Sequence, residues 1–180
     1  MTDQQAADIR TTARVIVAWV SEDDELDHVL RAALELGRNN GARVILYNRD
    51  SASAISDPMP NEWASQGEER LFGDPLSDAE LIKLGYEPFA RKVAAARADG
   101  VDAWGWLPAD HGTDELVEYG RTHDADLLLL PDELEDPGLG AKLKGETAGK
   151  AVEEAEKTGD GIAVLTVGRD GSASLATGRL

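Results

Sequence analysis

The chain has 180 residues, a formal net charge of −17 and no cysteine. Its length suits a single domain with a sizeable core, and the lack of cysteine excludes disulfides, thiolate catalysis and cysteine metal sites. The acidic excess argues against nucleic acid and anionic membranes as partners, because both need a basic face. No apolar run reaches the roughly 20 residues that span a bilayer. No secretory signal is recognisable, so we expect a cytoplasmic protein.

The expected elements begin after a polar segment at residues 1–13, which predicts a flexible N-terminal arm. Residues 14–20, RVIVAWV, form a short apolar run that predicts a strand buried on both faces. Ser21 is then the expected N-cap of a helix with an acidic first turn, and this helix ends near Gly41. A second buried strand is expected at residues 43–47. Together these elements predict a right-handed, parallel βαβ unit.

Residues 50–77 are rich in proline and glycine and lack periodicity, which predicts a long surface excursion. A helix is expected over 78–99, with a break near Gly85 and Pro88. Further strands are expected at 101–107, 127–130 and 162–167, and further helices at 113–123 and 146–157. Residues 168–180 predict a flexible tail. Five strands alternating with four helices indicate an α/β fold, a doubly wound parallel sheet with helices on both faces, over residues 14–167.

Three stretches of sequence carry a resemblance to a known family. They are VIVAWVSEDDELDHVLRAALELGRNNGARVILYN, GVDAWGWLPADHGTDELVEYGRTHDADLLLLP and AVEEAEKTGDGIAVLTV. In pattern and order they resemble the first βαβ unit, the later half and the closing helix and strand of the universal stress protein family. The resemblance implies the strand order 3-2-1-4-5. It also implies a ligand site at the carboxyl ends of the first and fourth strands, where the order reverses.

The positions that hold a nucleotide in that family are altered in this chain. Nucleotide-binding members have an aspartate after the first strand, then G-x-x-G, nine residues and G-[ST] after the fourth. The positions matched to them here are Val20, Pro131, Leu134, Gly145 and Glu146, with ten residues rather than nine between Leu134 and Gly145. A valine offers a base no hydrogen bond, and a proline has no N–H for a phosphate. With acids on both sides of the site, we expect that ATP does not bind in the usual way.

A rearranged phosphate loop remains an alternative, in the segment GLGAKLKGETAGK. The candidate cofactor-binding residues are Val20, Ser21, Gly138, Gly140, Lys144, Gly145 and Thr147. They would bind ATP or AMP with magnesium through glycine N–H groups and a helix N-terminus. The Walker spacing fails, because a lysine replaces its first glycine and an alanine follows Lys150. The other interpretation is an ordinary loop and helix cap.

Other polar and aromatic residues allow further interpretations. An acidic rim suggests a phosphate-accepting or cation-binding module, or simply solvated acids, at Glu22, Asp23, Asp24, Asp110 and Asp132. The fifth strand, however, ends in Gly168 and Arg169, without the lysine of receiver domains. The histidines lack metal-ligand spacing, so we expect exposed or locally bonded side chains and no metal site, at His28, His111 and His123. Trp104 and Trp106 either stack on a base or pack under a helix.

No catalytic constellation is recognisable, so we expect a binding or regulatory module in stress response that acts through contacts with an unknown protein. The alternative is a nucleotide-binding stress protein that uses the altered loop at 138–147. Residues 162–167, IAVLTV, would form an uncharged edge strand and are expected to pair in a homodimer. The alternative is that the tail after Gly168 folds back and covers that edge. The acidic surface fits either a salty cytoplasm or an ordinary acidic protein.

Overall fold

The computed structural model describes residues 3–51, 74–108, 112–134, 147–158 and 161–176. Its sheet has the order β3-β2-β1-β4-β5-β6. The strands are β1 (Val15–Val20), β2 (Arg43–Asn48), β3 (Asp102–Trp106), β4 (Leu127–Pro131), β5 (Ala163–Val167) and β6 (Ala173–Leu175). The first five pair in parallel and β6 is antiparallel to β5. The α/β class and the order 3-2-1-4-5 are therefore confirmed, with a sixth strand added.

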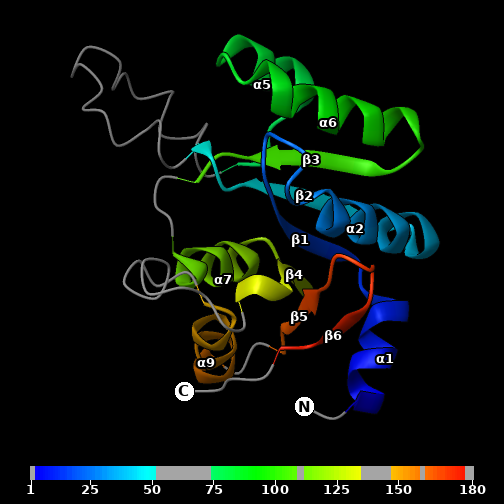
Figure 1. The fold of residues 1–180 in the computed structure, drawn as a ribbon, viewed down its shortest axis with the longest axis vertical. Helices are drawn as coiled ribbons and strands as arrows, with labels where there is room; N and C mark the ends of the chain where they lie inside the picture. Colours follow the sequence, from blue (N-terminus) through cyan, green and yellow to red (C-terminus); the bar gives the residue numbers. More distant parts are fainter. Residues whose placement is uncertain (1–2, 52–73, 109–111, 135–146, 159–160, 177–180) are drawn as a thin grey trace.

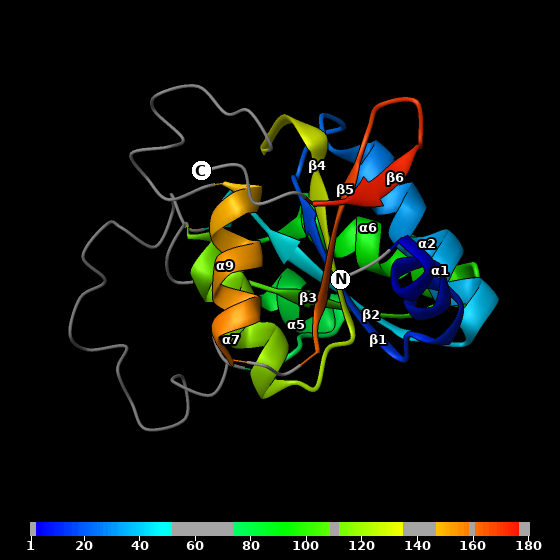
Figure 2. The same cartoon turned by 90° about the horizontal axis from the view of Figure 1, so that it is seen from below.

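Helices cover both faces of the sheet (Figures 1 and 2). The helical segments are α1 (Asp3–Thr12), α2 (Asp27–Asn40), α5 (Asp78–Lys83), α6 (Glu87–Ala98), α7 (Thr113–Thr122), the 3₁₀ turn η1 (Asp132–Leu134) and α9 (Ala148–Thr158). Alternate residues of β1 enter two separate cores. Ile16 and Ala18 pack with α2, α5 and α6, whereas Val17 and Trp19 pack with α7 and α9. This alternation of buried side chains explains the continuous apolar runs in the sequence.

The helix expected over 78–99 is divided in two, as its glycine and proline predict. α5 begins with a capping box, in which the Glu80 N–H donates to Ser77 Oγ and the Ser77 N–H donates to Glu80 Oε2. Gly85 adopts a φ of 88°, which favours glycine, and Pro88 lies in the first turn of α6. Gly41 ends α2 in the left-handed conformation, as expected.

The expectation of a flexible N-terminal arm is wrong for residues 3–12, which form α1. Ile9 packs against the core beside α2, and Asn40 Nδ2 donates to the Arg10 carbonyl at 2.7 Å. Arg10 Nη2 donates in turn to the Ala173 carbonyl on β6. The sequence of α1 is mostly polar, and short isolated helices are marginal in water. These tertiary contacts therefore account for a helix that periodicity did not reveal.

The expectation of a flexible tail is also wrong for residues 173–175, which form β6. Leu175 pairs with Leu165 and Ala173 with Val167, so β6 covers the outer side of β5. The turn between the strands contains Gly171 at a φ of 83°. β5 is consequently not an edge strand, and the alternative of a folded-back tail is the observed one. The structural reason for a homodimer through residues 162–167 is removed.

The remaining expectations concern the excursion after β2 and membrane-spanning helices. Of the excursion at 50–77, residues 52–73 lie outside the described residues. Leu76 forms an isolated antiparallel bridge with Gly105 of β3. Among the described helices, none is long and apolar enough to cross a membrane.

Candidate functional site

Two strands end at the point where the strand order of the sheet reverses. β1 ends at Val20 and β4 at Pro131, and the chain continues from β1 into α2 and from β4 into η1. Ligands of open α/β sheets bind in the crevice at such a reversal, outside the carboxyl ends of the strands. β2 is the parallel neighbour of β1, so its carboxyl end lies at the same edge of the sheet. The segments that follow β1, β2 and β4 therefore form the candidate site.

The strand ends themselves are apolar and buried. Val20 is 1% exposed and packs in the α2-side core, and its carbonyl accepts the Arg49 N–H at 2.9 Å. Pro131 is buried and has no N–H to donate. Leu134, which ends η1, packs in the opposite core with α7 and α9. All three residues thus serve the packing of the sheet, and their side chains offer a nucleotide no hydrogen bond.

Ser21 organises the loop between β1 and α2, so the expectation that it caps the helix is wrong. Its Oγ accepts the Leu26 N–H at 3.3 Å and donates to the Asp23 carbonyl at 3.3 Å. Asp23 Oδ1 accepts the Glu25 N–H at 2.9 Å, and this bond, followed by one from Ser21, lowers the pKa of Asp23. The two side chains satisfy N–H groups within the loop. α2 consequently begins only at Asp27.

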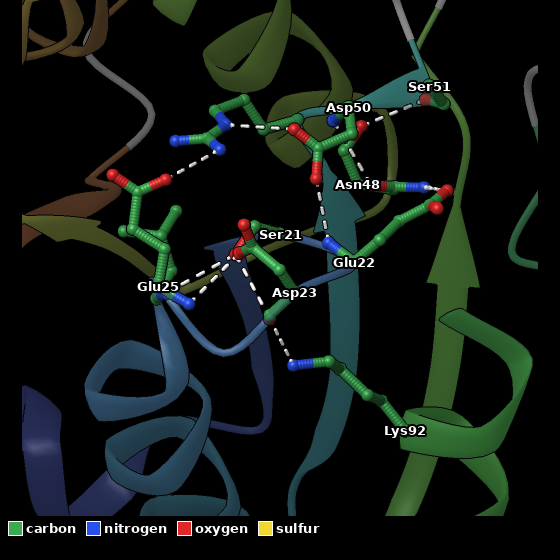
Figure 3. Close-up of polar contacts among 10 residues, drawn as sticks. Ser21, Glu22, Asp23, Glu25, Asn48, Asp50, Ser51 and Lys92 are labelled. Atoms are coloured by element: carbon green, nitrogen blue, oxygen red, sulfur yellow. Dashed lines mark hydrogen bonds and ion pairs between the residues drawn. The ribbon is translucent and has the colours of Figure 1, made fainter. Parts of the chain in front are cut away.

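A second network joins the ends of β1 and β2 (Figure 3). Asn48 is fully buried; its Nδ2 donates to Glu22 Oε1 at 3.0 Å, and its Oδ1 accepts the Asp50 N–H at 3.1 Å. Asp50 Oδ2 accepts the Glu22 N–H at 2.8 Å, which closes a ring of hydrogen bonds. Ser51 Oγ donates to the Asn48 carbonyl at 2.9 Å. These polar groups hold the two loops to each other.

The cations near this network are engaged by carboxylates. Arg49 donates to Glu25 Oε2 at 3.0 Å and to Asp50 Oδ1 at 3.2 Å. Although burial opposes the charge, these contacts raise the pKa of Arg49. Lys92 of α6 donates to the Asp23 carbonyl in the β1–α2 loop at 2.5 Å (Figure 3). It also donates to Asp27 Oδ1 at 2.7 Å. Both cations thus have carboxylate partners that would compete with a phosphate.

Two more acids follow β4, and a histidine lies beside them. Glu133 Oε2 is 3.8 Å from Nε2 of His28, while its Oε1 accepts a bond from Arg169 Nε at 2.8 Å. Burial and the neighbouring Glu133 carboxyl raise the pKa of Asp132. Burial opposes the charge of Glu133 as well, but the Arg169 bond lowers its pKa. The expectation of an exposed or locally bonded histidine is wrong for His28, whose side chain is only 4% exposed.

Of the predicted cofactor-binding residues, the structure describes Val20, Ser21 and Thr147. Thr147 Oγ1 accepts the Lys150 N–H at 3.1 Å, and its carbonyl accepts a bond from Thr113 Oγ1 at 3.0 Å. Thr147 therefore caps α9, which is the ordinary role weighed against phosphate binding. The rest of the predicted loop lies outside the described residues, at Gly138, Gly140, Lys144 and Gly145. Asp110 and His111 lie outside them too.

The aromatic side chains of β3 have different surroundings. Trp106 is buried and stacks on Tyr119 of α7, with ring centroids 3.5 Å apart, so it packs under a helix. Trp104 is half-buried; Arg97 lies over its ring at 4.3 Å, and its Nε1 donates to Asp102 Oδ1 at 2.7 Å. The His123 ring lies 4.2 Å from that of Tyr119. Trp106 is thus excluded as a stacking platform for a base.

Sequence reasoning missed the contribution of the β2 end and of His28. Asn48, Asp50 and Ser51 follow a predicted strand, and the convergence of parallel strand ends at one edge was the signal that could have identified them. His28 and Glu133 are far apart in the sequence, on α2 and η1, so no local spacing links them. Their proximity arises only because β1 and β4 are neighbours.

Comparison of the sequence with models of protein families and with curated proteins gave no match. Among solved structures, the chain is similar to a crystal structure of a universal stress protein in complex with cAMP. The TM-score is 0.50 at 18% sequence identity, and the match covers 87% of this chain and 97% of the other. The chain has a universal stress protein-like fold. The similarity extends over nearly the whole neighbour, so it concerns the complete sheet rather than a shared βαβ unit.

Proposed function

We propose that the chain is a universal stress protein-like binding or regulatory module that does not bind ATP in the usual way and acts through contacts with a protein. One observation carries this proposal: at the reversal point, buried apolar ends replace hydrogen-bonding groups. Val20 lies where a base would need a partner, and Pro131 lies where a phosphate would need an N–H. Among the described residues, we find no neighbouring side chain that offers the base or the phosphate the missing hydrogen bond.

Electrostatics support the same conclusion. Acids follow both strands of the crevice, with Glu22 and Glu25 after β1 and Asp132 and Glu133 after β4. The nearby cations Arg49, Lys92 and Arg169 are already in ion pairs with carboxylates. A triphosphate would have to break such pairs or lie close to like charges. At an effective dielectric near 20, each close like-charge pair costs about 4 kcal/mol at 4 Å.

A groove of about 390 Å³ between α2 and α6 supports the protein-contact part of the proposal. Leu30, Leu34 and Ala95 line it, and its charged lining contains more acids than cations: Glu22, Asp24, Asp27 and Asp99 against Arg91 and Lys92. An apolar floor with a rim of net negative charge is complementary to a peptide segment that carries both apolar and basic side chains. We therefore assign this groove to such a segment of a partner protein.

The similarity to a protein bound to cAMP favours one second candidate, a nucleotide-binding stress protein. In this alternative, ATP or AMP with magnesium would use the altered loop at 138–147, with Thr147 at the start of α9. Thr147 Oγ1 already accepts an α9 N–H, but the N-terminus of a helix remains suitable for an anion.

Calorimetric titration of ATP and AMP, each with magnesium in physiological salt, tests the proposal against this alternative. We expect no micromolar binding, because the base and the phosphates lack partners at Val20 and Pro131. Chromatography of the denatured protein should likewise detect no co-purified nucleotide. Micromolar binding of either nucleotide would reject the proposal and support the alternative.

The protein contact is tested by a photo-reactive residue in place of Leu34, with the same residue at Glu156 as the matched control on α9. We expect cross-linking of a defined partner protein from Leu34 only. Equal products from both positions, or none from Leu34, would contradict the assigned groove.

A further inference from the structure

His28 has an unusual environment for a histidine. It is the second residue of α2, it is 5% exposed, and its Nε2 has no hydrogen-bond partner among the described residues. The nearest carboxylate oxygen that we find is Glu133 Oε2 at 3.8 Å, which is too far for a hydrogen bond. A buried polar nitrogen without a partner is costly to the folded state. A ligand that bound Nε2 would remove this cost.

Two carboxylates face the same point from η1. One nitrogen of His28 and one oxygen each of Asp132 and Glu133 all lie within 4.8 Å of one another. The carboxyls of Asp132 and Glu133 are adjacent on η1 and repel each other when both are charged. A cation between the three groups would neutralise the repulsion and bind the buried nitrogen.

We propose that His28, Asp132 and Glu133 form a binding site for a divalent transition-metal ion of the zinc class. The site would lie at the carboxyl ends of β1 and β4 and join α2 to η1. This inference goes beyond the proposed function and does not depend on whether a nucleotide binds.

The ligand types select the class of ion. Imidazole nitrogen together with carboxylate oxygen suits Zn²⁺ and its neighbours, whereas Mg²⁺ and Ca²⁺ prefer oxygen ligands alone. Zn²⁺ lies about 2.0–2.2 Å from such atoms. The exposed carboxylates of Asp132 and Glu133 need only small rotations to reach it. Three protein ligands leave a fourth position of a tetrahedral ion for water or another ligand.

Neighbouring residues support the carboxylates. Arg169 Nε donates to Glu133 Oε1, so the other oxygen, Oε2, is directed toward His28. Such bonds from outside the site orient metal ligands. On the Asp132 side, a Cβ on Gly168 would lie 3.1 Å from Asp132 Oδ2. Glycine at the end of β5 therefore leaves the space that Asp132 occupies.

Titration of the full chain with Zn²⁺ tests the proposal. The protein carries no histidine tag, is treated with a chelator and is dialysed before calorimetry in physiological salt. We expect one Zn²⁺ per chain and a higher melting temperature, because only the folded state brings the three ligands together. Co²⁺ in place of Zn²⁺ should give a visible absorption band that Mg²⁺ does not remove.

Variants separate this site from general binding to an acidic surface. His28→Gln and Glu133→Gln should each weaken Zn²⁺ binding at least about tenfold, whereas the matched controls His123→Gln and Glu156→Gln should bind like the wild type. Glu133 is exposed, so its variant decides the question if the buried His28 variant fails to fold. Absence of binding, or binding that Glu133→Gln leaves unchanged, would overturn the proposal.

Discussion

Asn48 shows how a single side chain holds the candidate site together. It faces an acceptor, Glu22 Oε1, and a donor, the Asp50 N–H, so its position needs a side chain that both donates and accepts. Glutamine has the same groups on a longer stem, and aspartate lacks the donor. Because Asn48 is fully buried, water cannot replace either bond. The amide is therefore a determinant of the loop geometry after β1 and β2.

Asn48→Asp is expected to destabilise the protein strongly at pH 7, by about 3–5 kcal/mol, because it buries a carboxylate against Glu22. Burial and the like charge would raise the pKa of the new carboxyl in the folded state. The loss should therefore be small below the pKa of the unfolded state and grow as the pH rises above it. Urea unfolding at pH 4 and pH 7 measures both values.

The matched control is Asn39→Asp, the same change at an exposed position of α2. It lies near the helix C-terminus, where an added acid costs about 0.3–1 kcal/mol. A loss of similar size in both variants, or one that does not depend on pH at Asn48, would contradict the role assigned to the amide.

At the scale of elements, the sequence predicted the strands buried on both faces and the helices with clear apolar spacing. Their apolar runs need no knowledge of the rest of the chain, as β1 and β4 show. α1 and β6 were missed because they are polar or short and depend on contacts such as that of Arg10 with Ala173. The same limit applies to the site: His28 and Glu133 meet only through the order of the strands.

Removal of β6 tests its role as the cover of β5. A chain that lacks residues 171–180 exposes backbone groups on the outer side of β5, among them the Val164 carbonyl, which accepts the Ala176 N–H in the full chain. Uncovered apolar edge strands pair with other chains. We therefore expect light scattering to show dimers or larger species for this variant.

The matched control lacks only residues 177–180 and retains β6. It is expected to show the same mass as the full chain. A folded monomer after removal of residues 171–180 would mean that β6 does not protect the edge.

At the scale of the whole molecule, charge dominates the surface. The chain has 35 acidic and 18 basic residues, which gives a formal net charge of −17. Basic residues such as Arg49, Lys92 and Arg97 are already paired with carboxylates, so many acids have no basic residue left to pair with. Such an excess repels itself in the compact state. Stability should therefore depend on how far the solvent screens the charges.

The melting temperature is expected to rise from low salt to about 1 M NaCl, where the Debye length is near 3 Å. The double variant Glu35→Lys and Glu156→Lys lowers the net negative charge at two exposed positions and should show a smaller rise. Calorimetric scans at constant pH measure both. A melting temperature that is flat or falls with salt would exclude self-repulsion as a major term, and with it an adaptation to a salty cytoplasm.

The contact between α1 and β6 has a consequence for folding during synthesis. Arg10 and Ala173 are 163 residues apart, yet they are joined by a hydrogen bond. A ribosome releases about 5–20 residues per second, so α1 waits on the order of ten seconds or more for its partner strand. For most of that interval β4, the neighbour of β1 in the sheet, has not been made, and β5 follows later still. The apolar side chains of β1 therefore remain partly uncovered. The N-terminal βαβ unit is thus the part of the nascent chain that a chaperone would contact longest.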